Sequence, residues 1–231
     1  MMPASPKLSV LYEDNHLLVL NKPAGLATMG VAAGEDSLWE QGRRYLKQKY
    51  AKPGNVYLGV VSRLDAAVSG VIAFARTSKA AARLNEQFRE GTAEKTYLAI
   101  VNGSVPPPST ARLEHWMEKD EARQKMALSK TPRPGWKPAV LEFRRRRELA
   151  EQTWLLEVRL LTGRKHQIRA QLASAGWPIV GDRKYGSSRT SAQGIGLHSY
   201  SLSLSHPTLH DRRTWTAPPP QAWKLTPPDL D

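Results

Sequence analysis

Cysteine is absent from this chain of 231 residues, which excludes disulfides and thiolate metal sites and is compatible with a reducing cytoplasm. No apolar run reaches the roughly 18 residues that a membrane-spanning helix needs. The amino terminus, MMPASPKLSV, lacks a basic segment followed by an apolar core, so it does not resemble a secretory signal. We therefore expect a cytoplasmic protein that does not enter the membrane.

Recognisable ligand-binding patterns are also missing. Neither of the glycine patterns that cradle phosphates, GxGxxG and GxxxxGK followed by Ser or Thr, occurs in the sequence. The six histidines show no metal-ligand spacing, and His206 and His210 are separated by Pro207, which argues against a helical ligand pair. We expect neither a metal nor a cofactor.

Positive charge is abundant. The chain has 34 Lys and Arg against 21 Asp and Glu, which gives a formal net charge of +13 and a pI of about 10.1. Such an excess attracts polyanions, and nucleic acid is the usual one in a cytoplasm. A membrane surface is the rival partner, but no long segment pairs a basic face with a Trp and Leu face. The composition favours nucleic acid.

The first half of the chain alternates strands and helices. Residues 8–23 predict a hairpin that turns at 13–15, and 37–50 predict a helix weakened by Gly42. Strands are expected at 56–61, 71–75 and 94–101. Between the last two, a helix is expected to be capped by Ser78 and to end at Gly91, with Ala81, Leu84 and Phe88 facing the core.

The second half is richer in strands. Residues 102–137 hold many Pro and Gly and predict a loop-rich excursion with short strands; 140–149 and 153–161 predict an antiparallel pair. A helix is expected over 162–176, with Thr162 near its cap, and a strand over 197–207. The expected fold is α+β, with a mixed, largely antiparallel sheet flanked by helices and loops. We expect one domain over 1–231, with its core at about 8–210 and short irregular tails.

Two charged stretches need interpretation. RRRR (144–147) fits a solvated edge strand protected by charge and fits a phosphate contact about equally well. In SRLDAAVSG (62–70), Arg63 and Asp65 lie between two apolar runs. Taken alone, this segment favours a turn in which the Asp65 side chain caps the backbone.

The order of motifs along the chain changes that interpretation. The sequence contains, in order, YEDNHLLVLNKPAGL, SRLDAAVSG, a helix with EQF, EKTYLAIV, LLTGRKHQIRAQLASAGWPIVGDRKYG and LHSYSLSLSHP. In these six segments, which together span roughly residues 10–207, it resembles the RluA-type pseudouridine synthases. Six ordered matches are far more specific than any one of them.

The resemblance implies roles for individual residues. Asp65 matches the essential aspartate of the family, Tyr97 the aromatic residue that stacks on the target base, and Arg169 the basic residue that pairs with the aspartate. Arg63 matches the arginine that fills the space left by the extruded nucleotide, and Leu197 lies near the apolar residue that packs on the site. The basic motifs imply RNA contacts by Arg164, Lys165, His166, Gln167, Arg183 and Lys184.

The implied reaction converts uridine to pseudouridine and needs no metal or cofactor. A carboxylate can serve as nucleophile or proton acceptor, and a neighbouring arginine keeps it ionised and aimed. A base inside structured RNA must be flipped out and held by stacking, for which Tyr97 provides a platform; its phenol could also assist removal of the C5 proton. The expected substrate is rRNA or tRNA, and a monomer is the simplest assembly.

The sequence also departs from the family pattern. Ser62 replaces the usual histidine, and Ala66, Ala67 and Val68 replace polar residues that usually end in threonine. An S4-like RNA-binding domain, common in the family, has no room before a hairpin that starts near residue 8. The altered loop leaves open a catalytically impaired RNA-binding or RNA-folding factor on the same scaffold. A nucleoside hydrolase of unrelated fold has less support, because no second catalytic-looking carboxylate lies near Asp65 in the sequence.

Overall fold

The computed structural model describes residues 8–32, 34–106, 108–191 and 194–226. Its helices are α1 (Leu38–Lys49), α2 (Ser78–Glu90) and α3 (Gln167–Ser174), with the short 3-10 helices η1 (Arg183–Tyr185) and η2 (Gln221–Trp223). Its strands are β1 (Val10–Glu13), β2 (Leu17–Lys22), β3 (Gly59–Val60), β4 (Ser69–Ala75), β5 (Glu94–Asn102), β6 (Thr110–Asp120), β7 (Lys125–Ser129), β8 (Lys137–Ala150), β9 (Thr153–Leu160), β10 (Leu197–Ser205) and β11 (Arg212–Thr216).

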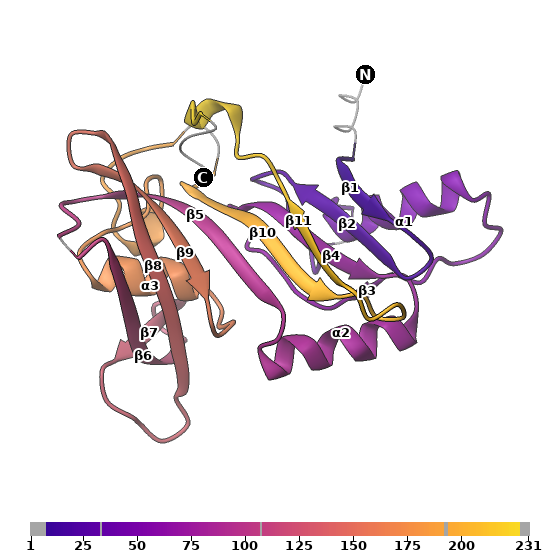
Figure 1. Cartoon of the computed structure of the whole chain (residues 1–231), viewed down its shortest axis with the longest axis horizontal. Coiled ribbons are helices and arrows are strands. Elements are labelled where there is room, and N and C mark those ends of the chain that lie inside the picture. Colours follow the sequence, from indigo (N-terminus) through magenta and orange to yellow (C-terminus); the bar gives the residue numbers. More distant parts are fainter. Residues whose placement is uncertain (1–7, 33, 107, 192–193, 227–231) are drawn as a thin grey trace.

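These strands form one mixed sheet in the order β1-β2-β4-β10-β5-β9-β8-β6-β7, with β3 paired to β4 and β11 paired to β10. Within the described ranges, β4 and β10 are the parallel neighbours and the other strand pairs are antiparallel. Figure 1 shows β1, β2 and α1 at one end of the sheet and β6, β7 and β8 at the other. The expected α+β fold with a largely antiparallel sheet is confirmed, and the sheet continues through β11, past residue 210.

Strands β2 and β4 are buried on both faces, which explains why their sequences are almost continuously apolar. Successive side chains of a strand point to opposite faces. One face packs on α1 through Leu18, Leu20, Ile72 and Phe74. The other packs against α2 through Leu17, Val19, Val71 and Ala73.

Gly42 supports α1 through close packing rather than weakening it. A Cβ atom at this position would lie 2.9 Å from Leu58 Cδ2 and 3.4 Å from Leu18 Cδ2. A larger residue would require the Leu58 side chain to shift, so glycine lets α1 pack closely on Leu58 and on Leu18 of β2 despite its low helix propensity.

A third apolar cluster holds β5, β8 and β9 against α3. Ile168 and Leu172 of the helix pack with Tyr97, Phe143 and Leu156 of the strands. The amino-terminal end of α3 is thereby fixed beside the exposed edge of this cluster, next to the loop that carries Asp65.

Two helix starts differ from the sequence expectation. Thr77, not Ser78, is the N-cap of α2, because its side chain accepts a hydrogen bond from the Ala80 amide. The helix expected at 162 begins only at Gln167, because His166 adopts a left-handed backbone conformation with φ 51°. Thr162 instead donates to Gln167 Oε1 at 2.8 Å and accepts from the Val140 amide at 2.8 Å, so it anchors the preceding loop to β8.

The strand expectations at 56–61 and 102–137 were wrong in extent. Only Gly59–Val60 of the first segment pairs with β4. The second segment contains the 11-residue strand β6, whose half-exposed side chains give a weak hydrophobic signal. Pairing with β8 and β7 on its two sides compensates for that weak pattern.

RRRR begins where the pairing of β8 with β6 ends: Thr110 of β6 faces Arg144, whereas Arg145 and Arg147 have their strand partners in β9. Its arginines contact their own protein. Arg144 Nη2 lies 3.4 Å from Glu157, Arg146 pairs with the same carboxylate, and Arg145 donates to the Val105 carbonyl at 2.6 Å. These contacts give the run a structural role within the sheet.

Candidate active site

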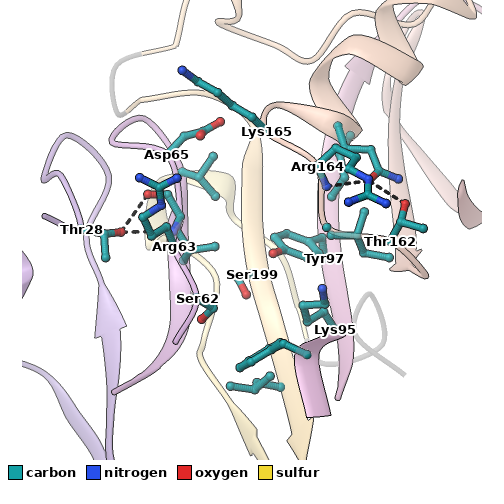
Figure 2. Close-up of a pocket in the computed structure, with 18 of the residues that line it drawn as sticks. Thr28, Ser62, Arg63, Asp65, Lys95, Tyr97, Thr162, Arg164, Lys165 and Ser199 are labelled. Atoms are coloured by element: carbon teal, nitrogen blue, oxygen red, sulfur yellow. Dashed lines mark hydrogen bonds between the residues drawn. The ribbon is translucent and has the colours of Figure 1, made fainter. Parts of the chain in front are cut away.

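A cavity of about 830 Å³ opens where the β3–β4 loop, β5 and the loop before α3 meet. Figure 2 shows Arg63 and Asp65 on one side of it and Tyr97, Lys95 and Arg164 on the other. Nine of the predicted site residues line this cavity: Arg63, Asp65, Tyr97, Arg164, Lys165, His166, Gln167, Arg169 and Leu197. Arg183 and Lys184 are in η1 and do not line it.

Asp65 and Arg169 are brought together although 104 residues separate them in the chain. Arg169 Nη1 donates to Asp65 Oδ2 at 3.0 Å, and the Asp65 side chain is 28% exposed whereas that of Arg169 is 8% exposed. The pKa of Arg169 is raised: burial acts to lower it, but contacts with Asp182 and Asp65 outweigh the burial. Arg169 therefore carries a fixed positive charge that aims one accessible carboxylate at the cavity.

Asp182 holds the other side of the same guanidinium. Its two oxygens accept from Arg169 Nε at 2.7 Å and from Nη2 at 2.9 Å, and its side chain is almost completely buried. Tyr185 stacks on the guanidinium at 5.2 Å from the ring centroid. Arg169 is thus held rigidly, with Nη1 left for Asp65.

Tyr97 projects from β5 into the cavity and is mostly covered by its neighbours. Burial raises the pKa of its phenol to about 12, with the Asp65 charge acting in the same direction and a hydrogen bond with Ser199 opposing it. The phenol is therefore protonated at neutral pH. It offers an aromatic face for a base rather than a ready proton acceptor.

Lys22, whose side chain is fully buried, holds the loop that carries Asp65 in place. Its ammonium donates to the carbonyls of Pro23 at 2.9 Å, Leu26 at 2.6 Å and Ala66 at 3.0 Å. Burial lowers the pKa of Lys22 to about 8, against the opposing effect of the Asp65 charge. Three carbonyl partners satisfy the three donors of an ammonium, so Lys22 ties the end of β2 to the residue next to Asp65.

Gly70 completes the placement of this loop. It has φ +117°, and a Cβ atom there would lie 2.2 Å from the Ser199 carbonyl oxygen. Glycine is therefore required where β4 pairs with β10, directly after the Asp65 loop.

Other predicted residues contribute in different ways. Gln167 is buried, and its amide donates to the Val140 carbonyl at 3.1 Å and accepts from the Arg164 amide at 3.0 Å, so it braces the loop. Leu197 belongs to the apolar cluster under Tyr97. Arg63 is exposed, and no hydrogen bond or ion pair from its guanidinium occurs within the described ranges.

The departures from the family pattern are placed differently from one another. Ser62 lines the cavity and also a smaller hollow next to it that is bounded by Trp39 and Met29. Val68 is buried in the apolar cluster with Tyr97, where a polar side chain would lose its water. Ala66 and Ala67 act through their carbonyls, which accept from Lys22 and from the Ile195 amide.

No group of three or more potential metal ligands is found in the part of the chain that the structure describes. Over the same residues, none of the helices has the length and apolar character needed to cross a membrane.

Sequence reasoning missed three residues that organise the site: Lys22, Asp182 and Tyr185. Lys22 follows the buried run LLVLN, where an inward-facing lysine demands buried acceptors. Asp182 and Tyr185 lie in GDRKYG between two glycines with φ +82° and +94°, a turn that brings both side chains to Arg169. A polar residue at such a position is a recognisable signal, but its partner is visible only in the fold.

Comparison with known proteins explains why these residues occur together. The model of a protein family described as RNA pseudouridylate synthase matches residues 16–174. The chain belongs to this family. The dual-specificity RNA pseudouridine synthase RluA of Escherichia coli K12 is 33% identical over 225 residues, covering 94% of this chain and 95% of that protein. RluA of Haemophilus influenzae is 29% identical over 221 residues, covering 93% and 94% of the two chains.

The resemblance to RluA-type synthases is thereby confirmed, and the chain is a pseudouridine synthase, an isomerase that modifies RNA. Two solved structures share its fold. Human RNA pseudouridylate synthase domain containing 4 has a TM-score of 0.76 at 23% identity, covering 96% of this chain and 91% of its own. Human RNA pseudouridylate synthase domain containing 1 has a TM-score of 0.72 at 23% identity, covering 95% of this chain and 87% of its own.

Proposed function

We propose that this synthase isomerises specific uridines in structured RNA, either rRNA or tRNA, with Asp65 as the catalytic carboxylate. It acts as a single-domain cytoplasmic monomer. The observation that carries the proposal is the contact of 3.0 Å between Arg169 and Asp65 at the wall of the cavity. It supplies an oriented, partly exposed carboxylate where a flipped base can reach it.

The reaction breaks the N1–C1′ glycosidic bond, rotates the uracil and forms a C5–C1′ bond, after which C5 loses a proton and N1 gains one. The atoms and electrons balance without an oxidant or a second substrate. The Asp65 carboxylate is the group that reacts with the nucleotide, as nucleophile or proton acceptor. Arg169 compensates its charge and keeps it in position.

The flipped uracil is proposed to stack on Tyr97 above Leu197, which both line the cavity. Arg63 is exposed beside Asp65 and is proposed to occupy the space that the base leaves in the RNA. Arg164 and Lys165 at the cavity, with Arg183 and Lys184 in η1, are proposed to contact phosphates. The net charge of +13 supports a polyanionic partner.

The test compares the pseudouridine maps of rRNA and tRNA in cells that lack the gene and in cells complemented with defined variants. The wild-type protein and the exposed control Asp211→Asn should restore the same sites. Asp65→Asn, which keeps the shape of the side chain, should restore none while still binding RNA. A map that does not change when the gene is removed would contradict the proposal and favour a non-catalytic RNA-binding factor.

A further inference from the structure

His166 lies between Tyr185 and the proposed catalytic carboxylate. Its Nδ1 atom is 3.0 Å from Tyr185 Oη, and its Nε2 atom is 3.7 Å from Asp65 Oδ2. Tyr185 Oη also accepts a hydrogen bond from the Met126 amide at 3.0 Å. Tyr185 and His166 therefore form a row of polar groups between β7 and Asp65.

The contact between Tyr185 and His166 is compatible with a tautomer of the imidazole in which Nδ1 accepts a hydrogen bond. Tyr185 Oη accepts from the Met126 amide, and in this arrangement its own proton is donated to His166 Nδ1. A neutral imidazole has one acceptor and one donor nitrogen, so Nε2 then carries the hydrogen. Burial lowers the pKa of His166 to about 4; the charges of Arg169, Lys184 and Lys165 act in the same direction and that of Asp65 opposes them, so the ring is neutral at physiological pH.

The Nε2–H group faces the same oxygen that Arg169 already contacts. Asp65 Oδ2 accepts from Arg169 Nη1 at 3.0 Å, whereas Oδ1 accepts no hydrogen bond from the residues that the structure describes. The 3.7 Å between His166 and Asp65 exceeds a hydrogen bond, but catalytic contacts often tighten when the substrate binds.

The backbone of His166 also points to a role at the site. It has φ 51°, a left-handed conformation that non-glycine residues seldom adopt, and its side chain is only 11% exposed. Such conformations persist where the surrounding structure holds them, and they gather at functional sites. Here the conformation directs the ring toward Asp65 rather than toward solvent.

We propose that His166 is a positioning residue for the reaction: with its Nε2–H tautomer fixed by Tyr185, it donates to Asp65 Oδ2 and leaves Oδ1 to react with the nucleotide. The inference rests on the proposed function of Asp65. It changes the role that the sequence suggested for His166, from an RNA contact to a group acting through the carboxylate.

The tautomer can be read directly, without any activity measurement. Long-range ¹H–¹⁵N correlation spectra of the ¹⁵N-labelled protein at neutral pH should assign to His166 a protonated Nε2 and an unprotonated Nδ1. In Tyr185→Phe the Nδ1 resonance should shift, because its hydrogen-bond donor is gone. A protonated Nδ1 or a doubly protonated ring in the wild type would overturn the proposal.

Kinetics test the consequence for Asp65. His166→Asn suits a left-handed backbone, but its shorter side chain cannot place a donor where Nε2 lies, and it should lower kcat for pseudouridine formation by about 10- to 100-fold at unchanged KM. Tyr185→Phe keeps the ring under Arg169 and should lower kcat by a smaller factor. In the double variant, Tyr185→Phe should add nothing to His166→Asn, because both act through one group.

The matched control is His210→Asn, because His210 is exposed and also left-handed, with φ 65°. It should convert RNA at the wild-type rate. A His166→Asn enzyme with wild-type kcat, or one that changes only KM, would overturn the proposal. A wild-type protein that converts no uridine would instead remove the proposed function, and the tautomer measurement would still decide the state of His166.

Discussion

Asp182 accepts hydrogen bonds from Arg169 Nε at 2.7 Å and Nη2 at 2.9 Å, and Arg169 Nη1 donates to Asp65. The buried carboxylate and the accessible one therefore have different tasks. Asp182 fixes the direction of Arg169, and Arg169 in turn fixes the direction of Asp65.

Asp182→Asn should lower kcat by about 100-fold, because an amide cannot accept at both positions and the guanidinium would turn away from Asp65. Binding of RNA should change much less, since Asp182 is buried and does not line the cavity. Single-turnover rates and RNA affinities measured on the same preparations separate the two effects. A variant with the wild-type rate would show that Arg169 does not depend on Asp182.

Gly70→Ala should destabilise the protein by about 3–5 kcal/mol, from a disfavoured positive φ together with a clash against the Ser199 backbone. Gly54→Ala is the matched control, because nothing lies within 4 Å of its added Cβ. Urea denaturation of both variants measures the difference. If Gly70→Ala and Gly54→Ala have equal free energies of unfolding, glycine is not required at position 70.

Lys22→Met should reduce the free energy of unfolding by about 2–4 kcal/mol, because three buried carbonyls lose their common donor. It should also lower the rate of the reaction, since the Ala66 carbonyl is next to Asp65. Lys47→Met on the exposed face of α1 should be close to neutral. If the two lysine variants have the same stability, the anchoring role of Lys22 is wrong.

Stability should fall in weak acid because of His198. Its ring is buried, with Nδ1 2.8 Å from Ser69 Oγ and Nε2 2.9 Å from the Ala217 carbonyl, and burial lowers its pKa from 6.5 to about 4. Well above pH 6.5 the ring is neutral in both states. Below pH 6.5, His198 binds a proton in the unfolded chain but not in the folded protein. The free energy of unfolding therefore decreases as the pH approaches 4.

The full effect of His198 is about 3 kcal/mol, and His166 acts in the same direction. Urea unfolding at about pH 7 and about pH 4.5 measures the loss. His198→Gln, whose side chain does not titrate, should show a smaller difference between the two conditions. The same pH dependence in both proteins would assign the acid sensitivity to other groups.

The sequence predicts much of the fold because its apolar patterns are strong where two faces are buried. Strands β2 and β4 are of this kind, and helix α2 is predicted from its single buried stripe of Ala81 and Leu84. Only short strands were expected where β6 lies, because its side chains are half exposed and its partners are β7 and β8. The start of α3 was misplaced because His166 has a left-handed backbone, and its side chain contacts Tyr185, which lies 19 residues further along the chain.

Some residues of the site could likewise be predicted from the sequence and others could not. The three predicted residues Asp65, Tyr97 and Arg169 do meet at one cavity, and the ordered motifs indicated this before any contact was known. Lys22 and Asp182 could not be assigned from the sequence, because their significance depends on which carbonyls and which guanidinium they meet. Ser62, Ala66 and Val68 all line the cavity, and Val68 also belongs to the apolar core.

The most direct test of the account uses RNA that carries tritium at C5 of its uridines, taken from cells that lack the gene. Forming the C5–C1′ bond expels the C5 hydrogen, so each conversion releases one tritium to water. The account predicts release by the purified wild-type protein and none by Asp65→Asn, at equal RNA binding. Release at the wild-type rate from the Asp65→Asn protein would contradict it.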